Sequence, residues 1–190
     1  MNLLKQTIMC LVILTVITGI AYPLIVTGIV QIAFPIRANG SLVFKDNKAI
    51  GSSLIGQSFS SLKYFWSRPS ATLPMPYNSA NSSGSNLGPL NPTLIENIKT
   101  RVTELKSFDS ENKTIIPVDL ATSSGSGLDP DITLAAAEYQ IPRVARARNI
   151  NETEVKNLVT KYAKGRQLGV LGEPRINVLE LNLALDVLGK

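Results

Sequence analysis

An uncharged apolar segment near the amino end constrains this chain more than any other feature. From Gln6 to Ile36 no side chain is charged, and most positions are Ile, Leu, Val, Ala or Phe. About 20 apolar residues of α-helix suffice to cross the hydrocarbon core of a bilayer, because each residue advances about 1.5 Å along the axis. The segment therefore predicts a single helix embedded in membrane lipid.

A cleaved signal peptide is the alternative for this segment. Such a peptide has a basic start, an apolar core of about 7 to 15 residues and a small-residue cleavage site. Lys5 supplies the basic start, but the apolar run is about twice too long and nothing like Ala-x-Ala closes it. The pattern favours an uncleaved transmembrane anchor over residues 1–36, followed by one soluble domain over 37–190.

Small and kink-forming residues recur on one face of the predicted anchor. Thr15, Gly19, Pro23 and Thr27 occupy every fourth position, and Pro23 removes one backbone donor. Small side chains let another helix approach closely, and neighbouring helices can shield a carbonyl that a proline leaves free. Gly19 and Pro23 are therefore candidates for contact with a partner helix, although an isolated anchor can carry the same residues.

The composition of residues 37–190 excludes several classes of function. The chain has no His, and its single Cys, Cys10, lies in the anchor, so the domain lacks disulfides, the usual metal ligands and the commonest general base. The formal net charge of +5 is scattered, without the clustered basic and aromatic residues typical of nucleic-acid binding. We expect a non-catalytic domain with no metal site and no nucleic-acid partner.

The charges that flank the anchor leave its orientation open. The amino end carries the α-amine and Lys5, while Arg37, Lys45 and Lys48 follow the span against Asp46. This balance leans against export of the domain, but long domains translocate largely regardless of their charge.

Turn and cap signals predict one α+β domain with short strands, long loops and about four helices. Asp46-Asn47 between two short apolar runs, Ser41–Lys45 and Lys48–Ile50, is typical of a β-hairpin. Ser, Asn, Gly and Pro crowd residues 51–92, which indicates a long irregular loop.

Cap residues and apolar stripes divide the second half of the domain. The expected elements are a helix over about 93–106 started by Asn91 and Pro92 or by a capping box of Thr93 and Glu96, a strand over Ile115–Leu120, a helix over Asp131–Gln140 that Pro142 breaks or kinks before a further helical run over Arg143–Arg148, a helix capped by Asn151, and a last helix capped by Asn177 and ended by Gly189.

An aromatic segment, Tyr64–Pro69, interrupts the polar loop. It contains three consecutive aromatic residues, including Trp66, the only Trp, and it also contains Arg68. Disordered linkers are poor in aromatic residues. The segment either anchors the loop onto the domain core, which we favour, or presents Trp66 and Arg68 as an interface hot spot to another protein.

Two further groups of residues could bind an anion. A run of small residues before Asp129 could turn its backbone amides toward a phosphate, and Arg143 and Arg146 share one face of a helix, with Gln140 one turn before Arg143. Neither common nucleotide fingerprint is present, so a plain loop and a solvent-facing helix end are the alternatives. The candidate contact residues are Gln140, Arg143, Ser124, Gly125, Ser126, Gly127 and Asp129.

Six blocks in order along the chain together resemble the KdpC subunits of bacterial potassium-transporting P-type ATPases. The blocks are Gly51–Gln57, Tyr64–Pro69, Gly84–Pro89, Gly125–Pro130, Gln140–Ala145 and Asn177–Asp186. The resemblance implies an accessory, non-catalytic subunit of an ATP-driven high-affinity K⁺ uptake complex in the plasma (inner) membrane. It implies three partners: a channel-like subunit that carries the K⁺, a P-type subunit that forms the aspartyl-phosphate, and a small single-span subunit.

The resemblance carries two further implications that conflict. It implies a catalytic chaperone that contacts ATP through Gln140 and the Ser-Gly loop, and it implies a cytoplasmic N-terminus with an extracytoplasmic domain. ATP is cytoplasmic, so an exported domain cannot reach it. We favour the extracytoplasmic placement and keep ATP as an implication of the family alone. The alternative function is an independent membrane-tethered protein that binds a small anionic ligand between Gln140, Arg143 and the loop Ser124–Gly127.

Overall fold

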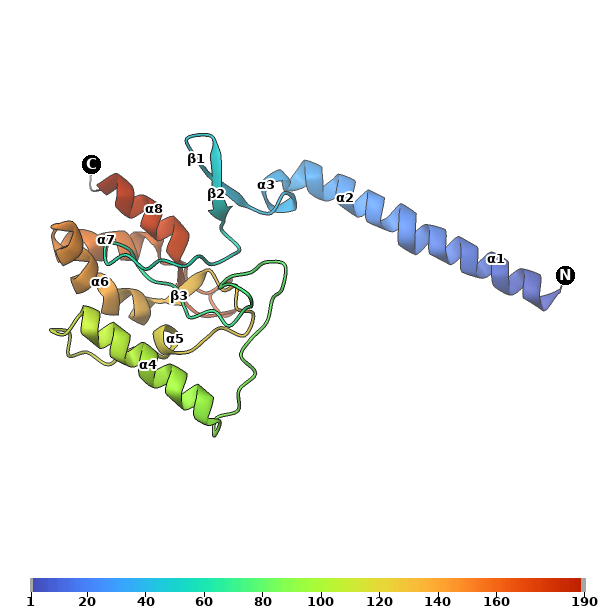
Figure 1. The fold of residues 1–190 in the computed structure, drawn as a ribbon. Coiled ribbons are helices and arrows are strands. Elements are labelled where there is room, and N and C mark those ends of the chain that lie inside the picture. Colours follow the sequence, from blue (N-terminus) through green and yellow to red (C-terminus); the bar gives the residue numbers. More distant parts are fainter. Residues whose placement is uncertain (1, 189–190) are drawn as a thin grey trace. The chain divides into compact units, whose positions relative to one another are not determined.

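The computed structural model describes residues 2–188, and the chain divides into two compact units at the Ile50–Gly51 bond (Figure 1). Unit 1 contains the apolar helix and most of a small hairpin, whose second strand ends at Ser52 within unit 2, and unit 2 contains the remaining helices and strands. The predicted boundary after Ile36 concerns the point where the chain leaves the membrane, and it stays a prediction.

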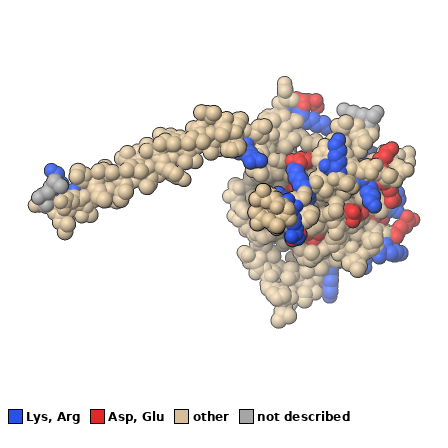
Figure 2. All heavy atoms as spheres, turned by 180° about the vertical axis from the view of Figure 1, so that it is seen from behind, with Lys and Arg blue, Asp and Glu red and all other residues tan. Residues whose placement is uncertain are grey.

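Unit 1 starts with a continuous helical rod. Its parts are α1 (Leu3–Val16), the π-helix η1 (Ile17–Ala21) and α2 (Tyr22–Ala33). Together they form a helix of 31 residues, in which an 18-residue stretch has a mean hydropathy of 2.4, and this is the one helix within residues 2–188 that is long and apolar enough to cross a membrane. Figure 2 shows this rod as tan except for blue atoms near its free end, whereas blue and red atoms mix over unit 2. The expected single span is therefore present.

The kink indicated by Pro23 stays a prediction, but a π-helix, η1, lies immediately before the α-helix that contains this residue. Pro23 is the second residue of α2, and in a regular α-helix its ring would press on the carbonyl of Gly19 one turn earlier. Gly19 lies inside η1, where the wider π-turn relieves this crowding. Contact of Gly19 and Pro23 with a partner helix stays a prediction.

The rest of unit 1 is a short helix and a hairpin. α3 (Pro35–Ala38) precedes β1 (Leu42–Lys45) and β2 (Lys48–Ser52). Asp46 and Asn47 both adopt left-handed backbone angles, with φ of 51° and 60°, as a two-residue hairpin turn requires. The structure thus confirms the predicted β-hairpin and its turn.

Unit 2 packs its helices around a two-stranded antiparallel ribbon. The elements are α4 (Pro92–Phe108), α5 (Val118–Ala121), β3 (Asp131–Thr133), α6 (Leu134–Arg148), α7 (Glu152–Tyr162), β4 (Arg175–Asn177) and α8 (Val178–Leu188). Ile132 of β3 lies opposite Ile176 of β4, and both side chains are buried. α7 contacts both α6 and α8, and buried side chains from all three helices belong to one core with Leu105 of α4.

The cap residues predicted from sequence start three of these helices. Asn91 accepts a hydrogen bond from the Thr93 amide at 2.9 Å, and Asn151 accepts one from the Thr153 amide at 2.8 Å. Asn177 accepts from the Glu180 amide at 3.1 Å in the same way. The helices α4, α7 and α8 are therefore confirmed, whereas the predicted terminator Gly189 lies outside the described residues.

The strand predicted over Ile115–Leu120 is wrong, because the chain forms the short helix α5 there. Pro117 precedes α5 with φ near −60°, which suits a helix start. The helical turn directs both Asp119 and Leu120 inward, and both are buried. A strand would have sent these neighbours to opposite faces, and the Asp119 carboxylate would then have missed the Thr133 amide to which it now bonds at 2.8 Å.

The helix predicted over Asp131–Gln140 is confirmed from Leu134 onward, but its predicted start at Asp131 is wrong, and so is a break at Pro142. Residues Asp131–Thr133 form β3, and Thr133 then caps α6 by accepting from the Ala136 amide at 3.1 Å. α6 continues through Pro142 to Arg148. The loss of one backbone hydrogen bond at Pro142 is tolerated because residues on both sides of it, Ile141 and Val144, are buried in the core.

Candidate functional site

The aromatic segment Tyr64–Pro69 is packed into the core of unit 2. Phe65 and Trp66 are buried, and the indole of Trp66 meets the ring of Phe108 edge-on with centroids 5.4 Å apart. The indole N–H donates to the Ser61 carbonyl at 3.0 Å. The structure thus confirms core anchoring as the role of the Trp66 side chain, and the long loop over 53–91 is fixed through it.

Two buried carboxamides hold the backbone of this segment. Gln140 of α6 accepts from the Trp66 amide at 2.7 Å and donates to the Trp66 carbonyl at 3.2 Å. Asn182 of α8 makes the same reciprocal pair with Phe65, at 2.8 and 2.9 Å. Each side chain therefore satisfies both backbone groups of one buried residue, as a neighbouring strand would do.

Arg143, one turn further along α6, holds the same segment. We refer to Gln140, Asn182 and Arg143 together as the clamp. The Arg143 guanidinium donates to the carbonyls of Leu62 and Tyr64 at 2.7 and 3.1 Å and to Gln140 Oε1 at 2.7 Å. It also lies 4.2 Å from the centroid of the Trp66 ring, a cation–π contact. Burial lowers the pKa of Arg143 to about 10, so the side chain remains charged at neutral pH.

An ion pair between Arg148 and Asp186 holds the start of the aromatic segment. The Tyr64 hydroxyl donates to Asp186 at 3.0 Å, and Arg148 donates to the same carboxylate at 2.8 Å. Arg148 also donates to the Lys63 carbonyl at 2.6 Å. Side chains from α6 and α8 thus fix the backbone from Leu62 to Trp66.

Arg68 and Asp129, which the sequence did not place together, form an ion pair. Arg68 Nη1 lies 3.2 Å from Asp129 Oδ2, and both side chains are partly exposed. The Ser124 amide donates to the Pro69 carbonyl at 3.2 Å. The aromatic segment is therefore joined at its far end to the loop that contains Ser124–Gly127.

The loop Ser124–Gly127 accepts hydrogen bonds from the segment around residues 70–84. We refer to this loop as the seat of that segment. Ser70 donates to the Gly127 carbonyl at 2.7 Å, and Ser82 donates to the Ser126 carbonyl at 3.0 Å. Gly127 has φ of +67°, and a Cβ there would come within 2.6 Å of the Ser83 carbonyl. The glycine at this position thus permits a left-handed turn and close backbone packing.

The hydrogen bonds that Gln140 and Arg143 make inside the protein limit their capacity to bind a nucleotide. The Gln140 amide uses both of its donors and both acceptor positions inside the protein, because Nε2 also donates to the Ala136 carbonyl at 3.1 Å. A triphosphate site needs several donors that point into open space. The arrangement at Gln140 and Arg143 does not fit a preformed site of this kind, and ATP contact through the candidate residues stays a prediction.

An open cleft of about 420 Å³ lies beside the aromatic segment. Its lining includes Trp66, Arg68 and Tyr77 together with Arg101 and Glu104 of α4. Arg101 pairs with Glu104 at 3.3 Å, and burial raises the pKa of Tyr77. The cleft combines aromatic surface with two guanidinium groups, each of which is paired with a carboxylate, Arg68 with Asp129 and Arg101 with Glu104, so an anion would have to compete with these ion pairs.

Sequence reasoning missed Arg101, Glu104 and Tyr77 as neighbours of Trp66. Arg101 lies beside the apolar stripe of α4, three positions after Ile98 and four before Leu105, so its spacing alone places it near the buried side of the helix. Its position 5.4 Å from the Trp66 ring centroid depends on how α4 packs, and no local signal in the sequence reports that. Among the described residues, no three His, Cys, Asp or Glu side chains are grouped to hold a metal.

Comparison with known proteins gives matches over nearly the whole chain. The family model described as "KdpC: K+-transporting ATPase, c chain" matches residues 4–187. The protein named "Potassium-transporting ATPase KdpC subunit" of Dechloromonas aromatica is 56% identical over 189 residues, covering 100% of this chain and 99% of the relative. Proteins of the same name from Burkholderia ambifaria and Methylococcus capsulatus are each 56% identical, with coverage of 97% and 98% of this chain and 96% and 98% of the relative.

Proposed function

The chain belongs to the KdpC family of K⁺-transporting ATPase c chains, and from this membership we propose that it is an accessory, non-catalytic subunit of an ATP-driven K⁺ uptake complex. The observation that carries the proposal is that the family match includes both the apolar helix and unit 2. A chain that shares both parts with the family has a helix that can anchor it in the membrane and an extramembrane domain of the same kind.

The partners in this proposal are the three subunits that the family resemblance implies. A channel-like subunit translocates the K⁺, a P-type subunit hydrolyses ATP, and a small single-span subunit accompanies them. We place this chain in the plasma (inner) membrane with a cytoplasmic N-terminus and with unit 2 outside the cytoplasm. The single membrane span supports an arrangement in which the two ends of the chain lie on opposite sides.

Unit 2 acts, in this proposal, through contact surfaces. The clamp formed by Gln140, Asn182 and Arg143 fixes the aromatic segment, and the seat at Ser124–Gly127 fixes the segment around 70–84. Long irregular loops that a compact domain keeps in order are usually functional. These fixed loops supply a preformed surface through which the subunit assembles and stabilises the complex.

The family resemblance also implies a catalytic chaperone, which raises the ATP affinity of the P-type subunit. We treat this role as a separate proposal. It does not require ATP to touch this chain, because a subunit that binds one conformation of its partner shifts the partner's affinity by linkage. Nucleotide affinity of the complex with and without this chain measures that effect. Equal affinities would remove the chaperone role and leave the assembly role intact.

The cleft beside Trp66 is the one observation that favours the second function, an independent binding protein for a small anionic ligand. Its two guanidinium groups, Arg68 and Arg101, could attract a carboxylate or phosphate. Micromolar binding of such an anion to the purified chain, together with isolation of that chain free of other subunits, would favour this function.

Affinity purification in mild detergent separates the two functions. The tagged full-length chain should bring down larger multi-span subunits in fixed proportion, and a tagged unrelated single-span protein should not. Recovery of the chain alone, from membranes that contain the other subunits, would contradict the accessory-subunit proposal.

A further inference from the structure

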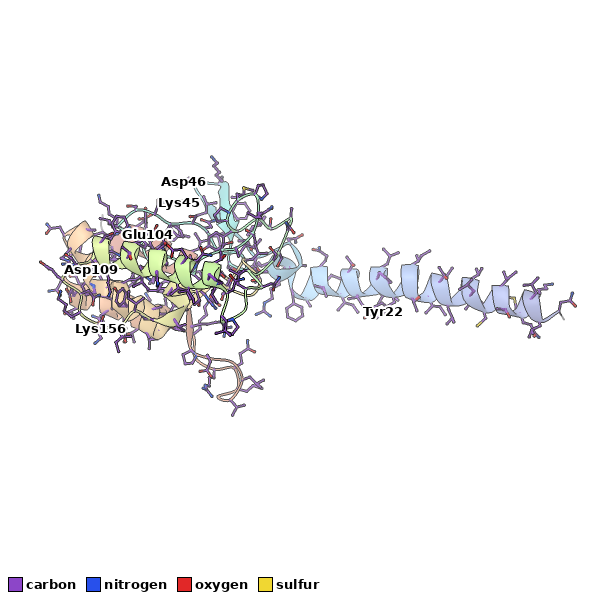
Figure 3. The ribbon with its side chains drawn as sticks, turned by 60° about the horizontal axis from the view of Figure 1, so that its bottom comes forward. Tyr22, Lys45, Asp46, Glu104, Asp109 and Lys156 are labelled. Atoms are coloured by element: carbon purple, nitrogen blue, oxygen red, sulfur yellow. The ribbon has the colours of Figure 1, made fainter. Side chains whose placement is uncertain are left out.

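The connection between α7 and β4 has an exposed apolar tip. Leu168, Val170 and Leu171 have 90%, 71% and 56% of their surfaces exposed, and every residue from Lys164 to Pro174 is exposed. We refer to residues 164–175 as the apolar hairpin. Figure 3 shows this segment as a loop that projects from the rest of unit 2.

The apolar hairpin has a defined backbone. Lys164 and Arg175 exchange backbone hydrogen bonds at 2.8 and 3.0 Å, and Gln167 and Leu171 exchange a second pair at 2.8 and 2.9 Å. These two isolated β-bridges join the arms of the loop at its base and next to its tip. The three apolar side chains are therefore held at the end of a structured stem.

The turn of the hairpin places a leucine where glycine or asparagine is usual. Leu168 has φ of +53°, and the following Gly169 has φ of +76°. A left-handed backbone is unfavourable for a residue with a bulky side chain. This leucine makes no contribution to the core of unit 2, because its side chain is almost fully exposed. Folding of unit 2 therefore gives no reason for leucine at this position.

We propose that the tip of the apolar hairpin docks into an aliphatic recess on the extramembrane surface of another subunit of the K⁺-transporting complex. The inference rests on the proposed function, and it names the contact surface that the function requires. Contiguous exposed apolar side chains on a projecting element mark interaction sites in soluble domains. A few such side chains at the centre of an interface supply most of its binding free energy.

The charges of the hairpin favour a protein partner over a lipid surface. Arg166 is paired with Glu173 at 2.8 Å, so the arms beside the tip carry no net positive charge from this pair. Segments that bind the surface of a bilayer combine aromatic residues with unpaired basic residues. Residues 164–175 contain no aromatic side chain, and the tip therefore lacks both features.

The size of the tip favours a subunit of the same membrane complex over a second copy of this chain. A stable interface between freely diffusing proteins buries about 800 Å² on each partner, which is more than three aliphatic side chains can supply. A contact inside an assembly can be smaller, because the membrane anchor already raises the effective concentration of the partners. The tip of the apolar hairpin then determines where unit 2 binds on its partner.

A triple variant of the full-length chain tests the docking. Leu168→Asn, Val170→Ser and Leu171→Ser together remove the apolar surface, and asparagine suits the left-handed backbone at position 168. We expect at least about a tenfold loss of co-purified larger subunits, because hot-spot side chains are replaced, with an unchanged melting temperature for unit 2. The matched control is Leu90→Asn with Ile115→Ser, which removes two apolar side chains that are 90% and 92% exposed elsewhere, and it should retain the partners.

The outcomes separate this inference from the proposed function. If the wild-type chain recovers the larger subunits and the triple variant recovers them equally, the docking proposal is overturned and the accessory function stands. If the wild-type chain recovers no subunits, the accessory function itself fails.

Photo-crosslinking identifies what lies against the tip in the otherwise intact chain. Val170 is replaced by the photo-reactive residue p-benzoylphenylalanine, and the membranes are irradiated before purification. An adduct with a larger subunit is the expected result. An adduct only with a second copy of this chain, an adduct only with phospholipid, or no adduct at all would overturn the proposal.

Discussion

Gln140 and Trp66 are joined by a reciprocal pair of hydrogen bonds across 74 positions of sequence, at 2.7 Å from the Trp66 amide and 3.2 Å to the Trp66 carbonyl. The side chain of one residue thus replaces the backbone of a neighbouring strand for the other. This relationship makes a loop that contains no helix or strand between β2 and α4 a fixed part of the domain.

Gln140→Ala should destabilise unit 2 by about 2–4 kcal/mol, because it leaves the buried amide and carbonyl of Trp66 without partners. Thermal unfolding of the full-length chain in detergent, followed by circular dichroism, measures the change. Glu138→Ala, at an exposed position of the same helix, is the control and should stay within about 0.5 kcal/mol. An equally small effect of Gln140→Ala would show that the clamp does not hold the loop.

Trp66→Ala should destabilise unit 2 by about 3–5 kcal/mol, because the indole is buried against Phe108 and its removal leaves a cavity. Denaturant unfolding monitored by circular dichroism gives the free energy of unfolding without the Trp signal. Tyr22→Ala removes an aromatic side chain that is exposed in the structure and should leave the unfolding of unit 2 unchanged. If the unfolding midpoint of Trp66→Ala equals that of the wild type, the indole does not stabilise the core, and the alternative of an interface hot spot is favoured.

The glycines of the Ser-Gly loop should respond differently to alanine. Gly127→Ala forces a Cβ to within 2.6 Å of the Ser83 carbonyl at φ of +67°, and we expect a loss of about 1–3 kcal/mol. Gly125→Ala meets nothing within 4 Å and should be nearly neutral.

The same pair of variants tests the anion hypothesis for this loop. If the loop serves only as a seat for residues 70–84, Gly125→Ala leaves nucleotide affinity of the assembled complex unchanged. A selective loss of nucleotide affinity in Gly125→Ala, with normal stability, would instead support an anion nest at Ser124–Gly127.

Asp131 should give unit 2 a distinct pH dependence. Burial is the main cause that raises the pKa of its carboxyl, although Arg175 at 2.9 Å and the more distant Lys164 oppose the shift and Asp129 adds to it. A raised pKa in the folded state means that the folded chain binds more protons, so this carboxyl contributes stability at low pH that is lost as pH rises from about 3.8 through the raised value.

Melting temperatures of the wild type and Asp131→Asn across this acidic window measure that contribution. The wild type should lose stability relative to Asp131→Asn as the pH rises, and Asp46→Asn, which changes an exposed turn carboxylate, should follow the wild type. Parallel curves for wild type and Asp131→Asn would contradict the assignment.

Local signals in the sequence were sufficient for the elements that depend on near neighbours. Asn91, Asn151 and Asn177 cap helices through bonds that reach only two or three positions ahead. The hairpin turn at Asp46-Asn47 is equally local, because two left-handed residues determine it. These elements were predicted correctly for that reason.

The elements that were predicted wrongly depend on distant residues. β3 exists because Asp131–Thr133 pairs with Arg175–Asn177, and α5 is fixed by the bond from Thr133 to Asp119. Neither partner can be recognised from the residues around Asp131 or Asp119. Tertiary pairing therefore overrode the local pattern at both places.

The candidate site was predicted only in part for the same reason. The aromatic content of Tyr64–Pro69 correctly indicated core anchoring, but the partner Asn182 lies 117 positions from Phe65. Gln140 and Arg143 were selected as possible ligand contacts because polar residues on a helix face suggest binding. The packing that turns them toward backbone groups cannot be read from their spacing.

K⁺-dependent ATP hydrolysis by purified membranes tests the accessory role most directly. Membranes that contain the channel-like, P-type and small subunits are compared with and without this chain, at equal amounts of the P-type subunit. The account predicts K⁺-dependent hydrolysis and uptake only when the chain is present, and recovery when the full-length chain is supplied again. Equal hydrolysis and K⁺ uptake in its absence would contradict the account.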